Sequence, residues 1–480
     1  MTPGRLGPLL VLLLACGPSG PGKSPQRKDA GVADPAPRDA PAALAPLALG
    51  MPDLASFGYR ARTGHAAFKL ARDGEAAGDW AAVVSRCREA LAADPEHLDA
   101  AYLLAVALAK TNAGAEAIVA PLAKAVAGDF AKWGAASLEQ PALQPFLATP
   151  LGRAWRRRVE EERPAFLAAL GRSLVVTAAG DLFAYDLETA RWYRLTRTGG
   201  AVVAALHVRS QQRLVYVTRE KVTEQATSRT RIGIGLVEIA AGRTRRAIEV
   251  GEVAATAALR IGYSTKKPPG FIVRAGKLAK AAWRLVEEPR LSLERVPAKA
   301  RPDVPAYLAD RIRMDVIGRS VRIDRVAVED VIADWDDSSL ASAIKIGRSK
   351  RVVTVPSPGL IDGDTATWST DRTQLAFVAQ LSDECARGVA TGAAFVADAA
   401  TGSVRELERA TGGIAIEWVA ERRLAIAGDR GVSIVDLGGG DPIVLGRADG
   451  LVTPRRMPTC AVPAEPPDAE PEPDPDVGGA

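Results

Sequence analysis

The sequence has few of the residues that enzymes and metal-binding proteins use for their chemistry. In 480 residues it contains three histidines and four cysteines, with no Cys-x-x-Cys pair. Zinc sites and histidine-based acid–base catalysis need several such side chains close together. There is a single asparagine, and the Gly-x-Ser-x-Gly motif of serine hydrolases is absent. The sequence therefore points to no catalytic residue, no metal site and no cofactor.

The apolar run at 9–14 is too short to cross a bilayer. Arg5 precedes it and Ala15 follows it, which gives the basic residue, short apolar segment and small residue of a signal peptide. Leu13-Leu14-Ala15-Cys16 resembles the lipobox of bacterial lipoproteins, although Leu14 is a less usual occupant of its position. The resemblance implies that residues 1–15 are cleaved off and that Cys16 carries a membrane-anchoring lipid. An ordinary secretory signal and an uncleaved anchor are the alternatives.

The charge balance gives little reason to expect a nucleic-acid partner. The formal net charge is +5, and the last twenty residues hold six acidic residues and no basic one, which leaves about +11 on the rest. Residues 156–158 are three arginines, but residues 160–162 are three glutamates. On a helix each arginine then has a glutamate four residues later. We interpret this stretch as a solvated helical face.

A nucleotide-binding motif occurs at residues 17–24, but its neighbours argue against it. The stretch reads Gly-Pro-Ser-Gly-Pro-Gly-Lys-Ser, which satisfies the P-loop pattern letter for letter. A P-loop binds phosphate through backbone N–H groups and a helix that begins at the lysine. Pro18 and Pro21 remove two of those donors, and Pro25 is the first of several prolines that prevent the helix. We predict no nucleotide partner.

Residues 16–55 are mostly proline, alanine, glycine and small charged residues. This composition predicts a disordered tether that holds the folded part away from the membrane surface.

Residues 56–170 have apolar residues at helical spacing. Breaks at Gly78-Asp79-Trp80 and Asp94-Pro95 divide them into helix pairs at about 64–97 and 98–131. These pairs resemble tetratricopeptide repeats, whose period is near 34 residues, with Cys87 in place of the usual aromatic residue. The resemblance implies a small surface that binds peptides or protein segments; a packing spacer is the other interpretation.

Short strands separated by turns replace the helical pattern from residue 171 to about residue 460. One apolar strand recurs, followed each time by another strand and an amphipathic one. It is found at 174–176, 214–217, 271–273, 375–377 and 424–426. The intervals of about 40 to 57 residues, with one indistinct unit between 321 and 355, indicate a β-propeller, and six four-stranded units fit.

The two ends of this β-region are out of phase in a way that predicts ring closure. The first unit begins on its second strand at residue 174, while 450–455 forms a strand with no unit of its own. Pairing of 450–455 beside 174–176 would complete the first sheet and remove an open edge.

The hairpin at 367–378 is the clearest unit of the series. Its last strand, 375–378, has no polar face, so we expect both sides of it to be covered. The hairpin resembles the repeats of TolB-type propellers, which are WD40-like, in which Trp-Ser-Pro-Asp-Gly precedes Leu-Ala-Phe. The matching residues are Trp368, Ser369, Asp371, Leu375, Ala376 and Phe377. Thr370 replaces the proline and Arg372 the glycine, which makes a positive φ at Arg372 unexpected.

The remaining cysteines and carboxylates have simple interpretations. Cys385 and Cys460 could form a disulfide near the ring seam in an oxidising compartment, or remain two free thiols. Cys87 lies at an apolar helical position and is expected to be a buried core residue. We interpret Asp362-Gly363-Asp364 as a turn and His207 as an ordinary strand residue.

The predicted fold is therefore a multidomain chain, α then β: a helical domain at 56–170, a propeller at 171–460 and a disordered acidic, proline-rich tail at 461–480. The function that fits is a non-catalytic, lipid-anchored envelope protein that binds other envelope proteins or cell-wall material. A propeller enzyme acting on a carbohydrate or lactone at the central channel is one alternative, and a structural or sensory role is another. Gly17 gives no acidic retention signal after Cys16, which favours the outer membrane, facing the periplasm.

Overall fold

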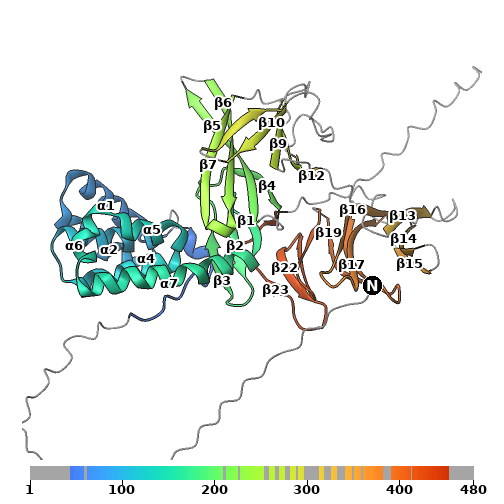
Figure 1. Cartoon of the computed structure of the whole chain (residues 1–480), viewed down its shortest axis with the longest axis horizontal. Coiled ribbons are helices and arrows are strands. Elements are labelled where there is room, and N and C mark those ends of the chain that lie inside the picture. Colours follow the sequence, from blue (N-terminus) through green and yellow to red (C-terminus); the bar gives the residue numbers. More distant parts are fainter. Residues whose placement is uncertain are drawn as a thin grey trace, which may run out of the picture. The chain divides into compact units, whose positions relative to one another are not determined.

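The computed structural model describes residues 44–58, 62–208, 212–224, 227–252, 259–264, 270–275, 282–287, 290–296, 313–317, 326–331, 341–348, 351–357, 360–381, 391–411 and 413–452. Within them, a helical region comes first and a β-rich region with several antiparallel sheets follows (Figure 1). This order of helices and strands confirms the predicted change of structure near residue 170.

Several sequence predictions lie outside the described residues. They include the signal peptide and lipid site at Cys16, the P-loop-like stretch at 17–24 and the acidic tail at 461–480. Cys385 and Cys460 also lie outside, so their disulfide stays a prediction.

The helices begin and end close to the predicted breaks. They are η1 (Leu54–Phe57), α1 (His65–Ala77), α2 (Trp80–Ala93), α3 (Leu98–Lys110), α4 (Ala115–Gly128), α5 (Phe130–Glu139), η3 (Pro141–Leu143), α6 (Gln144–Leu147) and α7 (Pro150–Arg172). Gly78 ends α1 in the left-handed region at φ 75°, and the Asp79 side chain caps α2 by accepting from the Ala82 N–H at 3.0 Å.

The helices share a core to which α3 contributes a nearly continuous buried run. Cys87 on α2 belongs to this core and is fully buried, as predicted. Burial, with a smaller contribution from the charge of Glu75, raises the pKa of the Cys87 thiol to about 12. The thiol therefore stays protonated and packs as an apolar side chain.

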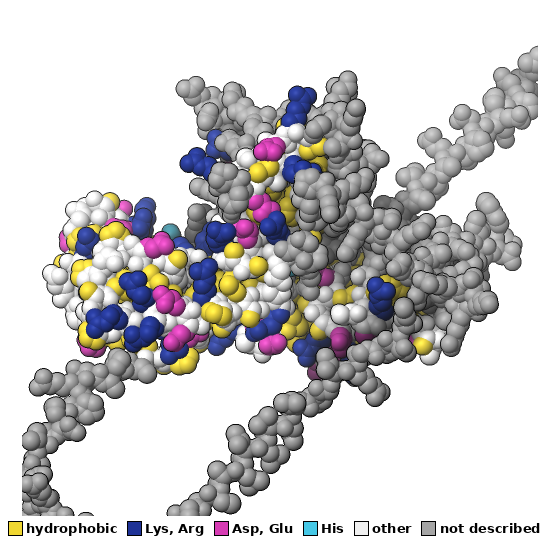
Figure 2. Space-filling model, in the orientation of Figure 1, with side chains coloured by type: hydrophobic (Ala, Val, Ile, Leu, Met, Phe, Trp, Pro, Cys, Tyr) yellow, Lys and Arg dark blue, Asp and Glu magenta, His cyan; other side chains and the backbone are white. Residues whose placement is uncertain are grey.

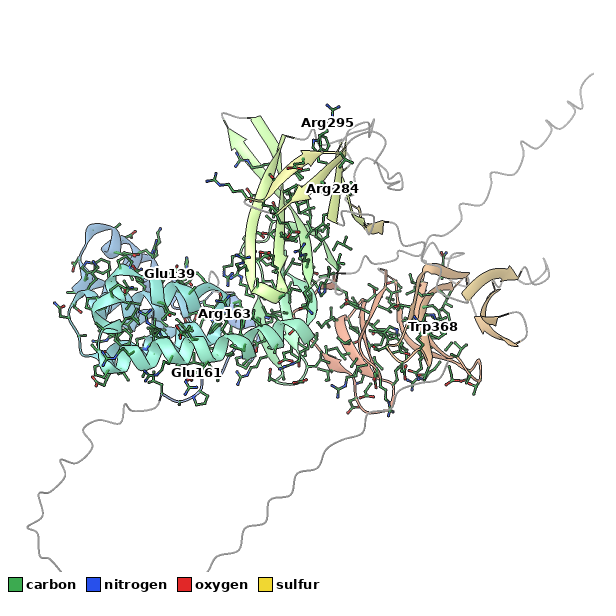
Figure 3. All side chains as sticks on the ribbon, viewed as in Figure 1. Glu139, Glu161, Arg163, Arg284, Arg295 and Trp368 are labelled. Atoms are coloured by element: carbon green, nitrogen blue, oxygen red, sulfur yellow. The ribbon has the colours of Figure 1, made fainter. Side chains whose placement is uncertain are left out.

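The exposed side of α7 carries the mixed charges that the sequence predicted. Arg156 and Arg157 are exposed, as a solvated face requires. Arg158 pairs with Glu161 at 3.2 Å and Glu162 at 3.6 Å, but Arg158 and Glu162 are only 20% and 12% exposed, so the solvated face does not include them. Figure 2 shows positive and negative side chains mixed over the helical region, and Figure 3 marks Glu161 on α7. None of the helices that the structure describes is both long and apolar enough to span a membrane.

Residues 44–58, which we call the N-terminal strap, join the helical region to the first sheet. The Leu47 N–H donates to Glu162 on α7 at 2.9 Å, and Met51 exchanges two backbone hydrogen bonds of 2.9 and 2.8 Å with Trp192. Leu54 and Phe57 are buried against the same sheet. The predicted tether boundary at residue 55 therefore needs correction, because apolar side chains of residues 44–55 pack into the fold.

The strands that the structure describes form six sheets. They are β1 (Leu174–Ala178), β2 (Asp181–Asp186), β3 (Arg191–Arg194), β4 (Val202–Val208), β5 (Arg213–Glu224), β6 (Thr227–Glu238), β7 (Arg243–Glu252), β8 (Leu259–Ser264), β9 (Gly270–Ala275), β10 (Ala282–Val286), β11 (Ser292–Arg295), β12 (Arg313–Ile317), β13 (Val326–Val331), β14 (Ala341–Arg348), β15 (Arg351–Ser357), β16 (Leu360–Trp368), β17 (Gln374–Leu381), β18 (Thr391–Asp398), β19 (Val404–Ala410), β20 (Ala415–Ala420), β21 (Arg423–Gly428), β22 (Gly431–Asp436), β23 (Ile443–Val444) and β24 (Gly450–Leu451). A 3-10 turn, η5 (Ile239–Ala241), links β6 to β7.

Four of the six sheets have the predicted four strands, in the orders β24-β1-β2-β3, β4-β5-β6-β7, β16-β17-β18-β19 and β20-β21-β22-β23. The other two depart from the prediction. Counting only the strands that the structure describes, one has three, β13-β14-β15, and one has five, β11-β10-β9-β8-β12. In the five-stranded sheet β12 runs parallel to β8 and covers the edge of β8 that β9 leaves unpaired.

The first sheet is completed from the far end of the chain, as predicted. β24 pairs antiparallel with β1, with Leu451 opposite Val176 and Gly450 opposite Thr177. Asp449 reinforces the pairing, because its backbone N–H donates to the Thr177 carbonyl at 2.9 Å and its carboxylate accepts from the Thr177 hydroxyl at 2.6 Å.

Both faces of the strand at 375–378 are covered, as predicted. Leu375 and Phe377 lie in one buried cluster, and Ala376 and Val378 lie in another. Trp368, at the end of the preceding strand β16, packs against the first cluster (Figure 3).

The turn before this strand corrects one expectation. Arg372 has φ 59°, although its replacement of glycine made a positive φ unexpected. Asp371 fixes the turn, because its carboxylate accepts from the Ser369 hydroxyl at 2.6 Å and from the Thr373 N–H and hydroxyl at 3.1 and 2.8 Å. These hydrogen bonds lower the pKa of Asp371, and they hold the backbone in a conformation that a side chain disfavours.

Candidate binding site

A pocket of about 490 Å³ lies where the two ends of the β-rich region meet, and we call it the seam pocket. The β1–β2 turn, the segment that follows β3 and the segment that precedes β24 all contribute to its lining. The N-terminal strap supplies a further wall through Leu54 and Phe57. The N-terminal strap, the first sheet with its connecting segments and the segment before β24, which are distant in the sequence, therefore meet at this one place.

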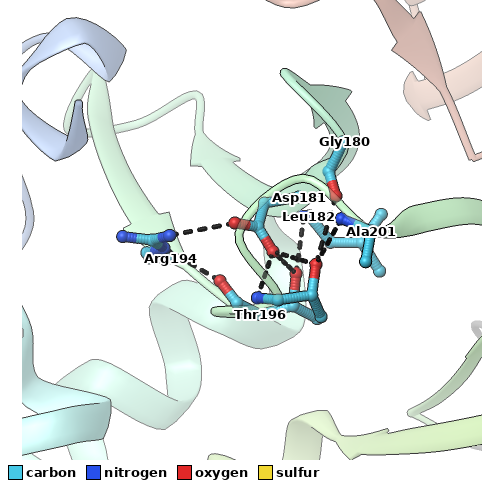
Figure 4. A network of polar contacts seen from close by, with 7 residues as sticks. Gly180, Asp181, Leu182, Arg194, Thr196 and Ala201 are labelled. Atoms are coloured by element: carbon cyan, nitrogen blue, oxygen red, sulfur yellow. Dashed lines mark hydrogen bonds and ion pairs between the residues drawn. The ribbon is translucent and has the colours of Figure 1, made fainter. Parts of the chain in front are cut away.

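Asp181, the first residue of β2, holds the polar side of the seam pocket together (Figure 4). One carboxylate oxygen accepts from the Thr196 hydroxyl at 2.8 Å and from the Thr198 N–H and hydroxyl at 2.8 and 2.9 Å. The other accepts from Arg194 Nη2 at 2.9 Å. Asp181 is buried and its oxygens are occupied by these donors, so its role is to fix Arg194 and the segment after β3.

Glycines allow the two turns at the pocket to lie against each other. Gly180 has φ 70°, and a Cβ there would overlap the carbonyl oxygen of Gly200, which itself has φ 93°. Side chains at these positions would strain the backbone and push the turns apart.

The apolar side of the pocket is formed by aromatic and aliphatic side chains. Leu54, Phe57, Ala178 and Phe183 line it, and each is buried. The Phe57 and Phe183 ring centroids lie 5.4 Å apart, and the Arg194 guanidinium carbon lies 5.9 Å from the Phe183 ring centroid. The pocket thus offers an apolar surface beside a guanidinium whose position Asp181 fixes and whose charge Asp181 balances.

Three arginines line the seam pocket, and two of them have acidic partners. Arg194 pairs with Asp181, and Arg197 pairs with Asp129, the residue that caps α5. Arg447 is exposed, and no acidic side chain of the described part of the chain lies within ion-pair distance of it. The pocket therefore has one positive charge that no acidic side chain of the described residues balances.

This arrangement suits a carboxylate ligand better than a neutral one. A guanidinium presents several N–H donors in one plane and binds a carboxylate through two of them. Arg447 provides such a group at the rim, while Arg194 and Arg197 are already oriented by their own partners. The apolar side would cover the uncharged part of the same ligand.

The residues that the sequence singled out lie elsewhere. His207 is in β4, opposite Leu214, as predicted for a strand residue. Asp362, Gly363 and Asp364 were predicted to form a turn, but they lie within β16, where the pairing with β17 shifts register. That prediction was wrong because a short Asp-Gly-Asp run also fits an irregular stretch of strand.

The enzyme alternative predicted carboxylates or a metal at a central channel. Among the residues described, no group of three or more His, Cys, Asp or Glu side chains is placed to hold a metal ion.

Sequence reasoning missed the seam pocket, because its arginines belong to no motif and come from separate segments.

A scan against protein-family models finds no match for this sequence, and no curated protein matches it either. Among solved structures, the chain is similar to TolB from Acinetobacter baumannii, with 11% identity and a TM-score of 0.21 over 56% of this chain and 61% of that one.

Two further structures illustrate the range of these matches. Tricorn protease matches with 10% identity and a TM-score of 0.29 over 58% of this chain and 26% of that one. The WD40 domain of SCAP from fission yeast matches with 8% identity and a TM-score of 0.15 over 56% of this chain and 70% of that one. The chain thus spans less than two thirds of TolB and of tricorn protease. Among the described residues, the succession of small antiparallel sheets is consistent with a propeller.

Proposed function

We propose that this chain is a lipid-anchored protein of the bacterial cell envelope that binds other envelope proteins or cell-wall material without catalysing a reaction. In this proposal Cys16 carries the lipid, the outer membrane holds it, and the folded part faces the periplasm. The β-rich region is a six-bladed propeller, and the helices before it are tetratricopeptide-like repeats. The lipobox-like Leu13-Leu14-Ala15-Cys16 and the six sheets among the described strands support it.

The observation that carries the binding function is the seam pocket. It combines a buried apolar side, two oriented arginines and Arg447 at the rim. We propose that it holds an acidic segment of the partner, with a carboxylate on Arg447 and apolar parts against Phe57 and Phe183.

Binding is tested with a fluorescein-labelled hexaglutamate peptide and the lipid-free chain that begins at residue 17. Fluorescence anisotropy at low salt is expected to detect saturable binding that weakens as salt screens the charges. Arg447→Ala removes one charge-assisted contact, so we expect its dissociation constant to rise about tenfold.

Arg86→Ala is the matched control, because Arg86 lies on α2, outside the pocket lining, and pairs only locally with Glu89 at 2.7 Å. It removes the same charge and is expected to leave the dissociation constant within about twofold of the original. Equal weakening by both substitutions, or equal binding of hexaglutamine, would overturn the proposed binding site.

The anchor is tested separately by labelling cells that express the chain with radioactive palmitate. The original chain is expected to incorporate the label and to sediment with membranes. Cys16→Ser, which removes the only sulfur that the lipobox-like stretch offers, is expected to abolish both. Labelling that persists in Cys16→Ser would contradict the proposed anchor.

A further inference from the structure

The C-terminal end of the described chain lies at the seam pocket. Leu451 pairs with Val176 two residues before Ala178, which lines the pocket, and Arg447 lies five residues before Val452, the last described residue. Whatever follows Val452 in the sequence therefore starts beside the pocket.

We propose that the chain's own acidic tail, residues 461–480, binds in the seam pocket and competes there with acidic segments of other molecules. This inference rests on the proposed function, since it assigns a regulator to the same site. It follows from the placement of the pocket, its charge and the composition of the tail.

The charges of the two parts are complementary. The tail contains Glu465, Asp468, Glu470, Glu472, Asp474 and Asp476 and no basic residue. The pocket lining contains three arginines and one aspartate, and that aspartate is occupied by Arg194 and the two threonines. A tail carboxylate on Arg447 would supply the acidic partner that this arginine does not have among the described residues.

The apolar chemistry also fits. Between residues 465 and 476 the acidic residues alternate largely with prolines, whose rings are apolar and whose nitrogens carry no hydrogen to desolvate. Phe57 and Phe183 present ring surfaces next to the arginines, as in other aromatic-lined sites that accept proline.

The tail is long enough to reach the pocket, and the covalent link through residue 452 keeps its local concentration there high. Twelve residues separate Val452 from Glu465, and the thirteen Cα–Cα steps between them can span up to about 43 Å. A segment tied at such a short distance has an effective concentration of roughly millimolar. If the free tail peptide binds with a dissociation constant near 0.2 mM, the attached tail would weaken an external ligand by about fivefold.

The test compares the lipid-free full chain with a version that ends at residue 460. The probes are the labelled hexaglutamate peptide and a labelled synthetic peptide of residues 461–480. Ending the chain at residue 460 is expected to tighten the binding of both probes by about fivefold. In the Arg447→Ala background the same truncation is expected to change the affinity by less than twofold.

Neutralisation provides a second variant that keeps the length of the chain. Converting the six tail carboxylates to amides, as in Glu472→Gln and Asp474→Asn, is expected to reproduce the effect of truncation at residue 460.

The outcomes separate this inference from the proposed function. If the full chain and the truncated chain bind hexaglutamate equally, the tail does not occupy the pocket, while the pocket remains a binding site. If truncation tightens binding equally with and without Arg447, the tail acts elsewhere and the inference is overturned. If neither chain binds hexaglutamate, the result contradicts both the proposed binding function of the pocket and this inference.

Discussion

Ending the chain after Asp449 is expected to lower the free energy of unfolding by about 4 kcal/mol, whereas ending it after Val452 should lower it by no more than about 1 kcal/mol, the contribution of a tail bound as proposed. The two versions differ by only three residues, two of which are the apolar Leu451 and Val452, each 6% exposed. Full burial of one such side chain stabilises a fold by about 1.5–3 kcal/mol. Urea unfolding followed by tryptophan fluorescence would measure the difference.

The physical reason is that β24 completes a sheet whose other strands come from the opposite end of the β-rich region. Without it, β1 would expose the backbone groups that pair with Gly450 and Leu451. The apolar side chains that surround Leu451, among them Leu174 and Val176, would also lose a neighbour. An exposed edge also favours association between chains, so the shorter version is expected to aggregate during purification.

Point substitutions keep this prediction testable if the shorter version does not fold. Leu451→Ala is expected to cost about 3 kcal/mol. Val444→Ala is the matched control, because Val444 also lies in a two-residue strand, β23, but is 64% exposed. It should change the free energy of unfolding by less than about 0.5 kcal/mol. Similar costs for the two substitutions would mean that the closing strand contributes little to the fold.

The pairing of β24 with β1 could be predicted from the sequence, because the number of strands in each unit shows that the first unit lacks one. A unit that begins on its second strand needs a first strand from elsewhere, and 450–455 was the only one left without a partner. The covered strand at 375–378 was predictable for a similar reason, because a run without a polar face needs neighbours on both sides. Both features follow from patterns within short windows of sequence.

The N-terminal strap and the seam pocket depend instead on contacts between distant segments. Met51, Leu54 and Phe57 follow no helical or strand period, and the prolines and alanines before them resemble a tether. Their burial is visible only once β3 and β1 are in place beside them. Arg447 likewise has no local signal, since a lone arginine between two short strands is ordinary on a protein surface.

The turn at Arg372 shows the opposite error, in which a local rule was applied too strictly. Replacing glycine disfavours a positive φ, but Asp371 and its hydrogen bonds to Ser369 and Thr373 impose one. Ser369, Asp371 and Thr373, whose hydrogen bonds stabilise the positive φ at Arg372, can all be seen in the sequence. Their combined effect is visible only as a set of hydrogen bonds in the structure.

Asp186→Asn is expected to lower the free energy of unfolding by about 2 kcal/mol, because it removes the charge of a buried carboxylate whose partner, Arg172, is 36% exposed. Asp186 ends β2 and its side chain is fully buried. Its two oxygens accept from Arg172 Nε and Nη2 at 2.8 and 2.7 Å, and Arg172 lies in the last turn of α7. Thr189 and the Glu188 N–H donate to the same carboxylate at 2.8 and 3.2 Å. The amide could accept only part of this set and would carry no charge.

Glu188→Gln provides the matched control for this substitution. Glu188 lies 3.2 Å from the same guanidinium, but its side chain is 70% exposed. An exposed ion pair contributes little, so the control is expected to cost less than about 0.5 kcal/mol. The double variant Arg172→Leu with Asp186→Asn should cost less than the sum of the two single changes, since both remove the same contact and Arg172→Leu alone leaves the buried Asp186 carboxylate without its charged partner. If Asp186→Asn and Glu188→Gln cost the same, this contact does not join α7 to the first sheet.

The pH dependence of the free energy of unfolding distinguishes the effect of removing the Asp186 charge from an effect of altered packing. Burial alone would raise the pKa of Asp186, but hydrogen bonds from Arg172, Thr189 and the Glu188 N–H lower it below its ordinary value of 3.8. The unfolded chain therefore takes up a proton at this position more readily than the folded one. The stabilisation is fully present above roughly pH 5 and is lost as the pH falls through 3.8 towards the lower pKa of the folded state. Measured between pH 7 and pH 3, the stability gap between the original chain and Asp186→Asn should narrow on acidification, whereas a gap caused by altered packing would stay constant.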